Sequence, residues 1–178
     1  MAEIDKKKCF TELGKFLSQF SNPRPQGELY DNKNASVKSP GVLHNELFFD
    51  AFENLIQLSQ SHNGWYTPEQ VCFSIQSWAE ALTEEHLNHW LSKYNLENIQ
   101  PKTVGLILAG NIPLVGFHDF LSVLVSGHHA LVKTSSSDQQ LLPFLAKYLI
   151  AVEPALEDYI TFTDGKLENF DAVIATGS

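Results

Sequence analysis

The sequence predicts an α/β protein in which a helical half is followed by a parallel, three-layer sheet. Before Pro101 the apolar residues recur at helical spacing and follow helix-start motifs, whereas after Pro101 short continuous apolar runs alternate with helical stretches. We therefore divide the chain into residues 1–41, an N-terminal helix with an extended arm, residues 42–100, a helical segment, and residues 101–178, an α/β domain.

The first half is expected to contain four helices. Apolar residues at helical spacing predict helices over residues 4–20 and 43–61. The arm over residues 21–41 holds three prolines and two glycines and lacks the apolar surface to fold alone. Thr67 and Thr83 are the expected N-caps of the two remaining helices, and Pro in the first position with Gln in the third strengthens the first of these starts.

The second half is expected to alternate strands with helices. The expected strands cover residues 103–109, 129–133, 159–163 and 171–176. A largely apolar helix is expected from about Leu114 to Val125, and another from near Asp138. In open parallel sheets ligands bind beyond the carboxyl ends of the strands, where helix N-termini offer unpaired N–H groups. The turns that follow these strands are therefore the candidate binding sites.

Composition and charge exclude several classes of protein. The chain has 178 residues and a net charge of −9 with no basic stripe, which argues against nucleic-acid binding. Its longest apolar run, Val104–Phe117, is interrupted by Asn111 and Pro113 and is too short to span a bilayer. The two cysteines, Cys9 and Cys72, form no C-x-x-C pair and fit reduced thiols. We expect a cytoplasmic protein without a membrane span.

Asn111, in the turn after the first expected strand, has two interpretations. Its side-chain amide could donate a hydrogen bond to a developing oxyanion. Alternatively, Asn111 caps the following helix, because Pro113 suits a first helical turn.

The turns after two other strands also hold polar candidates. Lys133, with Ser135 and Ser136 behind it, could bind a nucleotide ribose or phosphate. Alternatively, Lys133 is solvated, and the serines and glutamines at positions 136–140 form a capping box for the next helix. Gly177 and Ser178 could approach a pyrophosphate closely, because Gly lacks a Cβ and Ser donates, although Gly-Ser alone is a weak signal.

Metal and nucleotide-binding signatures are otherwise weak. The chain contains no G-x-G-x-x-G and no G-x-S-x-G motif. His86 and His89 stand one helical turn apart, but no third ligand lies nearby, so we expect no metal.

The order of the turns resembles that of a known family. A buried strand ending in Asn-x-Pro, a strand ending in Lys before a polar turn, and a strand ending in Thr-Gly-Ser resemble the cofactor domain of the aldehyde dehydrogenase superfamily. The segment GLILAGNIPLVGFHDFLSVLVSGHHALVKTSSSDQQLL, with DAVIATGS after it, is most similar to the fatty acyl-CoA reductase branch related to the bacterial luminescence reductase. The resemblance covers roughly residues 43–178 and implies an incomplete Rossmann-like parallel sheet with helices on both faces.

This resemblance implies a reaction and roles for the candidate residues. In the family, a cysteine thiolate attacks the thioester of an acyl-CoA, and a nicotinamide cofactor reduces the acyl-enzyme to an aldehyde. Asn111 stands where the family's oxyanion-stabilising Asn stands, and Lys133 stands where its ribose-binding Lys stands. Gly177 and Ser178 stand at the turn near the cofactor phosphates.

Three positions depart from the family pattern. Gly110 replaces the Trp common before that Asn in ordinary aldehyde dehydrogenases, and Thr134 replaces the Pro common after the Lys. Ser136 stands where NAD-preferring members carry a Glu, which binds ribose hydroxyls and repels a 2′-phosphate. Since Ser does neither, we expect NADPH as the cofactor.

The nucleophilic cysteine of the family lies well after the Thr-Gly-Ser turn, and neither Cys9 nor Cys72 matches its position. We therefore expect the N-terminal part of an acyl-CoA reductase, truncated before its catalytic domain, inactive alone and prone to self-association through uncovered apolar surface. The alternative is a non-catalytic α/β binding or interaction module that keeps the fold without the chemistry.

Overall fold

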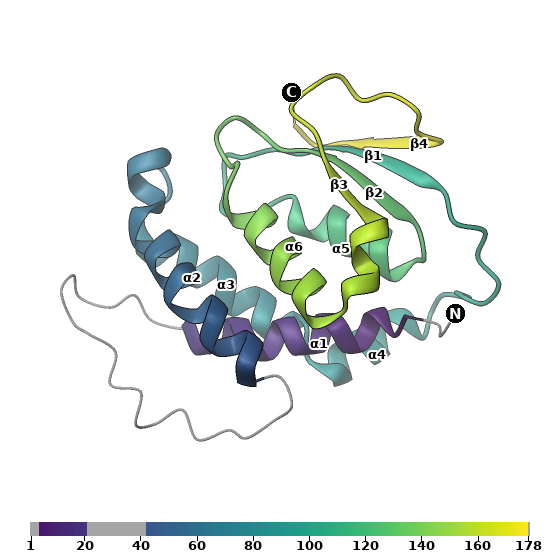
Figure 1. The fold of residues 1–178 in the computed structure, drawn as a ribbon, viewed down its shortest axis with the longest axis horizontal. Coiled ribbons are helices and arrows are strands. Elements are labelled where there is room, and N and C mark those ends of the chain that lie inside the picture. Colours follow the sequence, from purple (N-terminus) through teal and green to yellow (C-terminus); the bar gives the residue numbers. More distant parts are fainter. Residues whose placement is uncertain (1–3, 21–41, 178) are drawn as a thin grey trace.

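The computed structural model describes residues 4–20 and 42–177. The extended arm expected over residues 21–41 and the candidate residue Ser178 lie outside the described residues. Figure 1 shows the sheet on one side of the molecule, α5 and α6 next to it, and α1 beyond them with the other helices of the first half. The sheet is thus separated from most of the first half by its own helices.

The first half is helical, as predicted. Its elements are α1 (Lys6–Leu17), the 3₁₀ turn η1 (Ser18–Phe20), α2 (Val42–His62), α3 (Pro68–Ala81) and α4 (Glu84–Leu91). Both predicted N-caps are confirmed, because the hydroxyl of Thr67 accepts a hydrogen bond from the backbone N–H of Gln70, and that of Thr83 from His86. Each bond satisfies an N–H group that a helix start leaves unpaired.

The second half is the predicted parallel α/β sheet. Within the described residues its elements are β1 (Thr103–Ile107), α5 (Phe117–Val125), β2 (His129–Lys133), α6 (Leu141–Val152), the 3₁₀ turn η3 (Pro154–Tyr159), β3 (Ile160–Phe162) and β4 (Ala172–Ala175). The four strands are parallel, in the order β3-β2-β1-β4. The order therefore reverses beside β1, and open sheets of this kind bind ligands at such a reversal.

Two helices begin later than predicted, and both shifts lengthen a turn. α5 starts at Phe117 instead of near Leu114, because Leu114 has a φ of 59°, a left-handed conformation that a right-handed helix does not include. α6 starts at Leu141 instead of near Asp138, whose N–H closes a separate turn onto the carbonyl of Ser135 at 3.1 Å.

One apolar core joins the two halves. The apolar face of α1 is buried against α3, α5 and α6. Phe16 of α1 stacks on Tyr148 of α6 with 4.3 Å between ring centroids, and Phe10 meets Phe117 of α5 edge-on at 6.2 Å. Burial of these large aromatic side chains fixes the sheet and its helices to the first half.

No helix within residues 4–20 or 42–177 combines the length and the apolar character needed to cross a bilayer.

Candidate functional site

Three turns meet at the carboxyl edge of the sheet. Ile107, the last residue of β1, is in register with Lys133 of β2 on one side and with Ala175 of β4 on the other. Just beyond, the N–H of Leu108 donates to the carbonyl of Lys133 at 3.1 Å, and the N–H of Gly177 donates to the carbonyl of Ile107 at 3.0 Å. The fold therefore brings the turns of all the candidate residues to one edge.

Asn111 lies exposed in the turn between β1 and α5. The capping interpretation is wrong, because the N-cap of α5 is Gly116, which makes no side-chain cap bond, and the helix begins six residues after Asn111. The left-handed Leu114 separates Asn111 from the helix. The Asn111 amide thus faces solvent at the edge of the sheet, where a ligand can reach it.

The turn after β2 presents the second group of candidates. Lys133 and Ser135 are half-buried and Ser136 is exposed. The hydroxyl oxygen of Ser135 accepts the backbone N–H of Ser137 at 3.2 Å, which closes the turn. Lys133 and Ser136 therefore project from a turn whose shape is fixed by its own hydrogen bonds.

Asp138, which the sequence analysis did not single out as a site residue, lies in the turn just before α6. The capping box expected at positions 136–140 is wrong, because Gln140 stands at the N-cap without a side-chain cap bond, and Oδ1 of Asp138 accepts the N–H of Leu141 at 3.3 Å. Burial raises the pKa of the Asp138 carboxyl, while hydrogen bonds from backbone N–H groups and from the hydroxyl of Tyr66 oppose that rise.

Two glycines allow the turns to lie this close together. A Cβ on Gly110 would lie 2.6 Å from the Cβ of Ser135, and a Cβ on Gly177 would overlap the carbonyl group of Leu108. Neither position has room for a side chain in this arrangement. The departure of Gly110 from the Trp of the resembled family thus has a steric reason, since Ser135 occupies the space.

The connection between α2 and α3 supports the same turns from outside the sheet. The side-chain N–H₂ of Asn63 donates to the carbonyls of Gly110 at 3.3 Å and of Ser137 at 3.1 Å. The hydroxyl of Tyr66 lies within hydrogen-bond distance of the carbonyls of Gly110, at 3.1 Å, and of Ile112, at 3.2 Å. Sequence analysis singled out neither Asn63 nor Tyr66 as a site residue, because no local motif marks either contact.

Comparison with protein families identifies the chain. The acyl-CoA reductase (LuxC) family matches residues 75–178, more than half of the chain, and the match includes all three turns. The chain belongs to this family. No curated protein and no solved structure matches it. The resemblance read from the turns is confirmed, and the supporting residues Asn63 and Tyr66 lie before the matched range.

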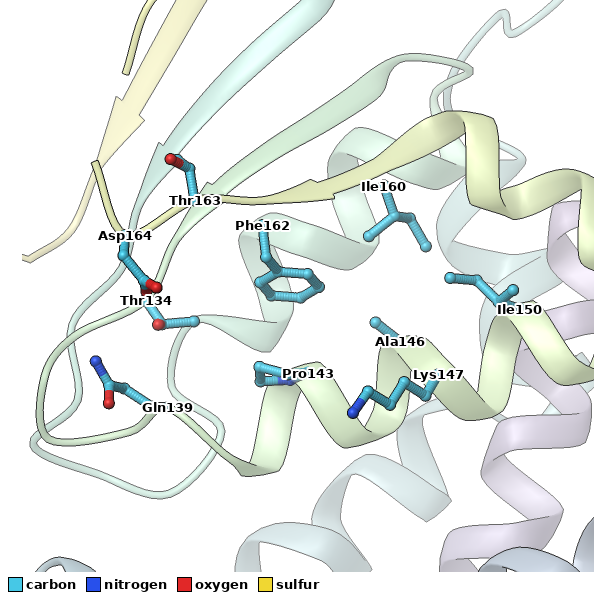
Figure 2. A pocket seen from close by; sticks show the side chains of 10 residues that line it. All are labelled: Thr134, Gln139, Pro143, Ala146, Lys147, Ile150, Ile160, Phe162, Thr163 and Asp164. Atoms are coloured by element: carbon cyan, nitrogen blue, oxygen red, sulfur yellow. The ribbon is translucent and has the colours of Figure 1, made fainter. Parts of the chain in front are cut away.

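A hollow of about 420 Å³ opens beside the Lys133 turn of this LuxC-family chain, between α6 and β3. Figure 2 shows the polar groups of the two turns, from Thr134, Gln139, Thr163 and Asp164, together at one end, and the apolar side chains from α6 and β3 beside them. The apolar residues are Pro143, Ala146, Ile150, Ile160 and Phe162, and the polar ones are Thr134, Gln139, Lys147, Thr163 and Asp164. Such a surface, apolar along α6 and β3 and polar at one end, suits a flat heterocyclic base.

The two cysteines of the LuxC-family chain lie on the core faces of α1 and α3. Cys9 is 5% exposed and Cys72 is 3% exposed, and both are free thiols. Burial raises the pKa of each thiol to about 11. Because the thiolate is the nucleophile, neither group is activated at neutral pH.

Within the described residues, no three His, Cys, Asp or Glu side chains are placed to hold a metal ion. Of the two histidines one helical turn apart, His86 donates through Nδ1 to the carbonyl of Glu80 at 2.7 Å, and His89 is exposed.

Proposed function

We propose that this chain is the cofactor-binding part of an NADPH-dependent acyl-CoA reductase, which converts a fatty acyl thioester to an aldehyde through a cysteine acyl-enzyme. The observation that carries the proposal is the meeting of the Asn111, Lys133 and Gly177 turns at one sheet edge in a LuxC-family chain. A dinucleotide and a thioester carbonyl bound at this edge would face the same turns.

The residues at the edge fit a nicotinamide dinucleotide. Lys133 and the hydroxyls of Ser135 and Ser136 are donors suited to ribose and phosphate oxygens. Gly177, whose missing side chain lets its turn pack against the carbonyl of Leu108, stands at the proposed phosphate turn, and Ser178 is the proposed further donor. The hollow beside α6 offers a surface for the adenine ring. When bound, the cofactor supplies the hydride that reduces the acyl group.

Ser136 determines the choice of cofactor in this proposal. It is exposed and uncharged, so it presents no carboxylate to repel a 2′-phosphate. Lys133 in the same turn adds a positive charge. This combination favours NADPH over NADH.

Asn111 stabilises the oxyanion in the proposed reaction. Its exposed amide donates to the carbonyl oxygen as negative charge develops there, an effect that is typically worth about 10²- to 10³-fold in rate. The nucleophilic cysteine comes from a part of the enzyme outside these 178 residues, because Cys9 and Cys72 are buried as protonated thiols. The chain alone is therefore inactive, and its free thiols fit a cytoplasmic enzyme.

Fluorescence titration of the purified chain with NADPH and NADH tests the cofactor assignment. We expect the unaltered chain to bind NADPH more tightly than NADH. Lys133→Ala should weaken NADPH affinity about tenfold, and Ser136→Glu should shift the preference toward NADH. Ser77→Glu, on the exposed face of α3, controls for the added charge. Tenfold tighter binding of NADH by the unaltered chain would contradict the cofactor choice, and binding of neither dinucleotide would contradict the function.

Two further measurements test the assignment of the nucleophile. Incubation of the chain with dodecanoyl-CoA and NADPH should yield no aldehyde, and aldehyde formation would show that one of the buried cysteines reacts. The buried thiols also favour the second candidate, a non-catalytic binding module. An intact mass above 20.0 kDa for the protein captured from its source cells supports the reductase, and a mass of 20.0 kDa supports the module.

A further inference from the structure

A groove of about 350 Å³ opens beside Asn111, on the side of the α2–α3 connection. Three segments line it: the connection itself, the first turns of α3, and the turn between β1 and α5. The lining residues that matter here are Trp65, Glu69, Phe73, Asn111, Ile112 and Pro113. The groove therefore includes the residue proposed to hold the thioester carbonyl.

Large apolar side chains line this groove without being part of the core. Trp65 is 78% exposed, Phe73 is 74% exposed and Ile112 is 53% exposed. α3 buries its other face, with Val71 and Ile75 fully covered, so Phe73 contributes little to holding the helix in place. Isolated exposed apolar residues are common, but three that share one groove form a patch of the kind that binds an apolar ligand.

The backbone around the groove is held in place by the contacts that support the site. The backbone N–H of Trp65 donates to Oδ1 of Asn63 at 3.0 Å, and the side-chain N–H₂ of Asn63 donates to the turn at Gly110. Thr67 caps the start of α3, which fixes the turn that carries Phe73. The groove is therefore formed before a ligand arrives, which lowers the entropy cost of binding.

The charge of the lining indicates the class of ligand. Among the described lining residues Glu69 is the charged one, and its carboxylate disfavours phosphates and fatty-acid carboxylates. An uncharged hydrocarbon chain meets no such penalty. Since Asn111 lines the same groove, a chain attached to the carbonyl that Asn111 contacts would lie close to Trp65 and Phe73.

We propose that this groove binds the acyl chain of the thioester substrate, with Trp65 and Phe73 as its walls. The inference rests on the proposed function, since it takes Asn111 as the carbonyl contact. It assigns contact with the acyl chain to two residues that lie before the range shared with the family.

Titration calorimetry with dodecanoyl-CoA and acetyl-CoA on the full 178-residue chain tests this proposal. We expect dodecanoyl-CoA to bind at least about tenfold more tightly than acetyl-CoA, and Phe73→Ala to remove about tenfold of that affinity, because apolar contact area is lost. Phe73→Leu should retain most of it. Leu58→Ala, at a 56% exposed position of α2 outside the groove, is the matched control and should change nothing.

Each contrary result has a distinct meaning. Equal affinity of both thioesters, or an unchanged dodecanoyl-CoA affinity in Phe73→Ala, would overturn the groove assignment. If Phe73→Ala loses NADPH affinity, the groove holds the nicotinamide instead. If Phe73→Ala converts an oligomer of the chain to monomers, the groove holds a second copy of the chain. Either result would overturn the groove assignment. NADPH binding by the unaltered chain is measured separately, so failure of the proposed function is recognised independently.

Discussion

The hydroxyl oxygen of Tyr66 lies 3.1 Å from the carbonyl oxygen of Gly110. Tyr66 belongs to the helical half and is 3% exposed, whereas Gly110 begins the turn that presents Asn111. Burial raises the pKa of the phenol, so its proton stays available for donation over the whole physiological range. The position of the candidate oxyanion donor therefore depends on a residue outside the sheet.

Tyr66→Phe should destabilise the protein and weaken the site. The substitution keeps the ring but removes a hydroxyl that lies within hydrogen-bond distance of the carbonyls of Gly110 and Ile112. Both carbonyls keep a second donor, so we expect the loss of about 0.5–1.5 kcal/mol that is typical of one hydrogen bond. Urea unfolding should show this loss, and NADPH affinity should fall with it. Tyr94→Phe, at a 58% exposed tyrosine, is the control. Equal unfolding midpoints for the two variants would contradict the supporting role.

Gly110→Ala should separate the two turns that meet at the sheet edge. The new Cβ would lie 2.6 Å from the Cβ of Ser135, an overlap that the backbone must relieve at a cost of about 1–3 kcal/mol. We expect a lower unfolding midpoint and weaker NADPH binding. Gly64→Ala, where no heavy atom lies within 4 Å of the added Cβ, should be nearly neutral. Equal effects of the two substitutions would show that the close approach at Gly110 does not matter.

The buried thiols should make the protein less stable at alkaline pH. The pKa of Cys9 and of Cys72 is about 11 in the folded chain, against 9.0 for an ordinary thiol. Between these values the unfolded thiols lose protons that the folded ones keep, so the free energy of unfolding falls as pH rises from 9 through 11. Burial raises the pKa of Tyr148 to about 12, which acts in the same direction.

Urea midpoints measured across this pH window check the prediction. Cys72→Ala should show a smaller fall between pH 9 and pH 11 than the unaltered chain, because one of the titrating thiols is absent. A fall of the same size in both proteins, or a midpoint that rises with pH, would contradict the assignment.

The β4 edge should promote self-association, as expected from the sequence. β4 pairs with β1 and is one of the two edge strands of the sheet within the described residues, and Val173 on it is 49% exposed. An apolar strand with an unpaired edge is a template for pairing between chains. Light scattering should show an average molar mass that rises with protein concentration, and Val173→Lys should reduce this rise. Leu58→Lys, at a comparably exposed position, should leave it unchanged.

The places of the turns could be predicted because each strand is a short apolar run with polar residues after it. β2 was predicted with its observed bounds, and Lys133 is its last residue. β1 was predicted to reach Ala109 but ends at Ile107. Leu108 lies in the turn after β1 but is buried, because Gly116 packs against it. The apolar run therefore extends past the end of the strand, and periodicity alone does not distinguish a buried turn from a strand.

The surroundings of the site could not be predicted in the same way. Asn63 and Tyr66 lie 47 and 44 residues before Gly110, and contacts at such separations leave no periodic pattern. Residue propensities also do not predict the left-handed backbone conformation of Leu114, since Leu rarely adopts that conformation. It is this residue that separates Asn111 from α5 and removes the capping interpretation. Local chemistry thus located the candidate residues, while tertiary packing determined what each can do.

The burial of α1 between α3 and α6 has a consequence for synthesis of the chain. α1 ends at Leu17, whereas α6 begins only at Leu141. At roughly 5–20 residues per second, a ribosome needs on the order of 6–25 s to travel from one to the other. During that interval Phe16 has no Tyr148 to stack on, and the apolar face of α1 is open to other nascent chains. α1 is translated before the other described helices and yet is among the last to be fully enclosed, so the yield of folded protein should depend on how well the cell shields it.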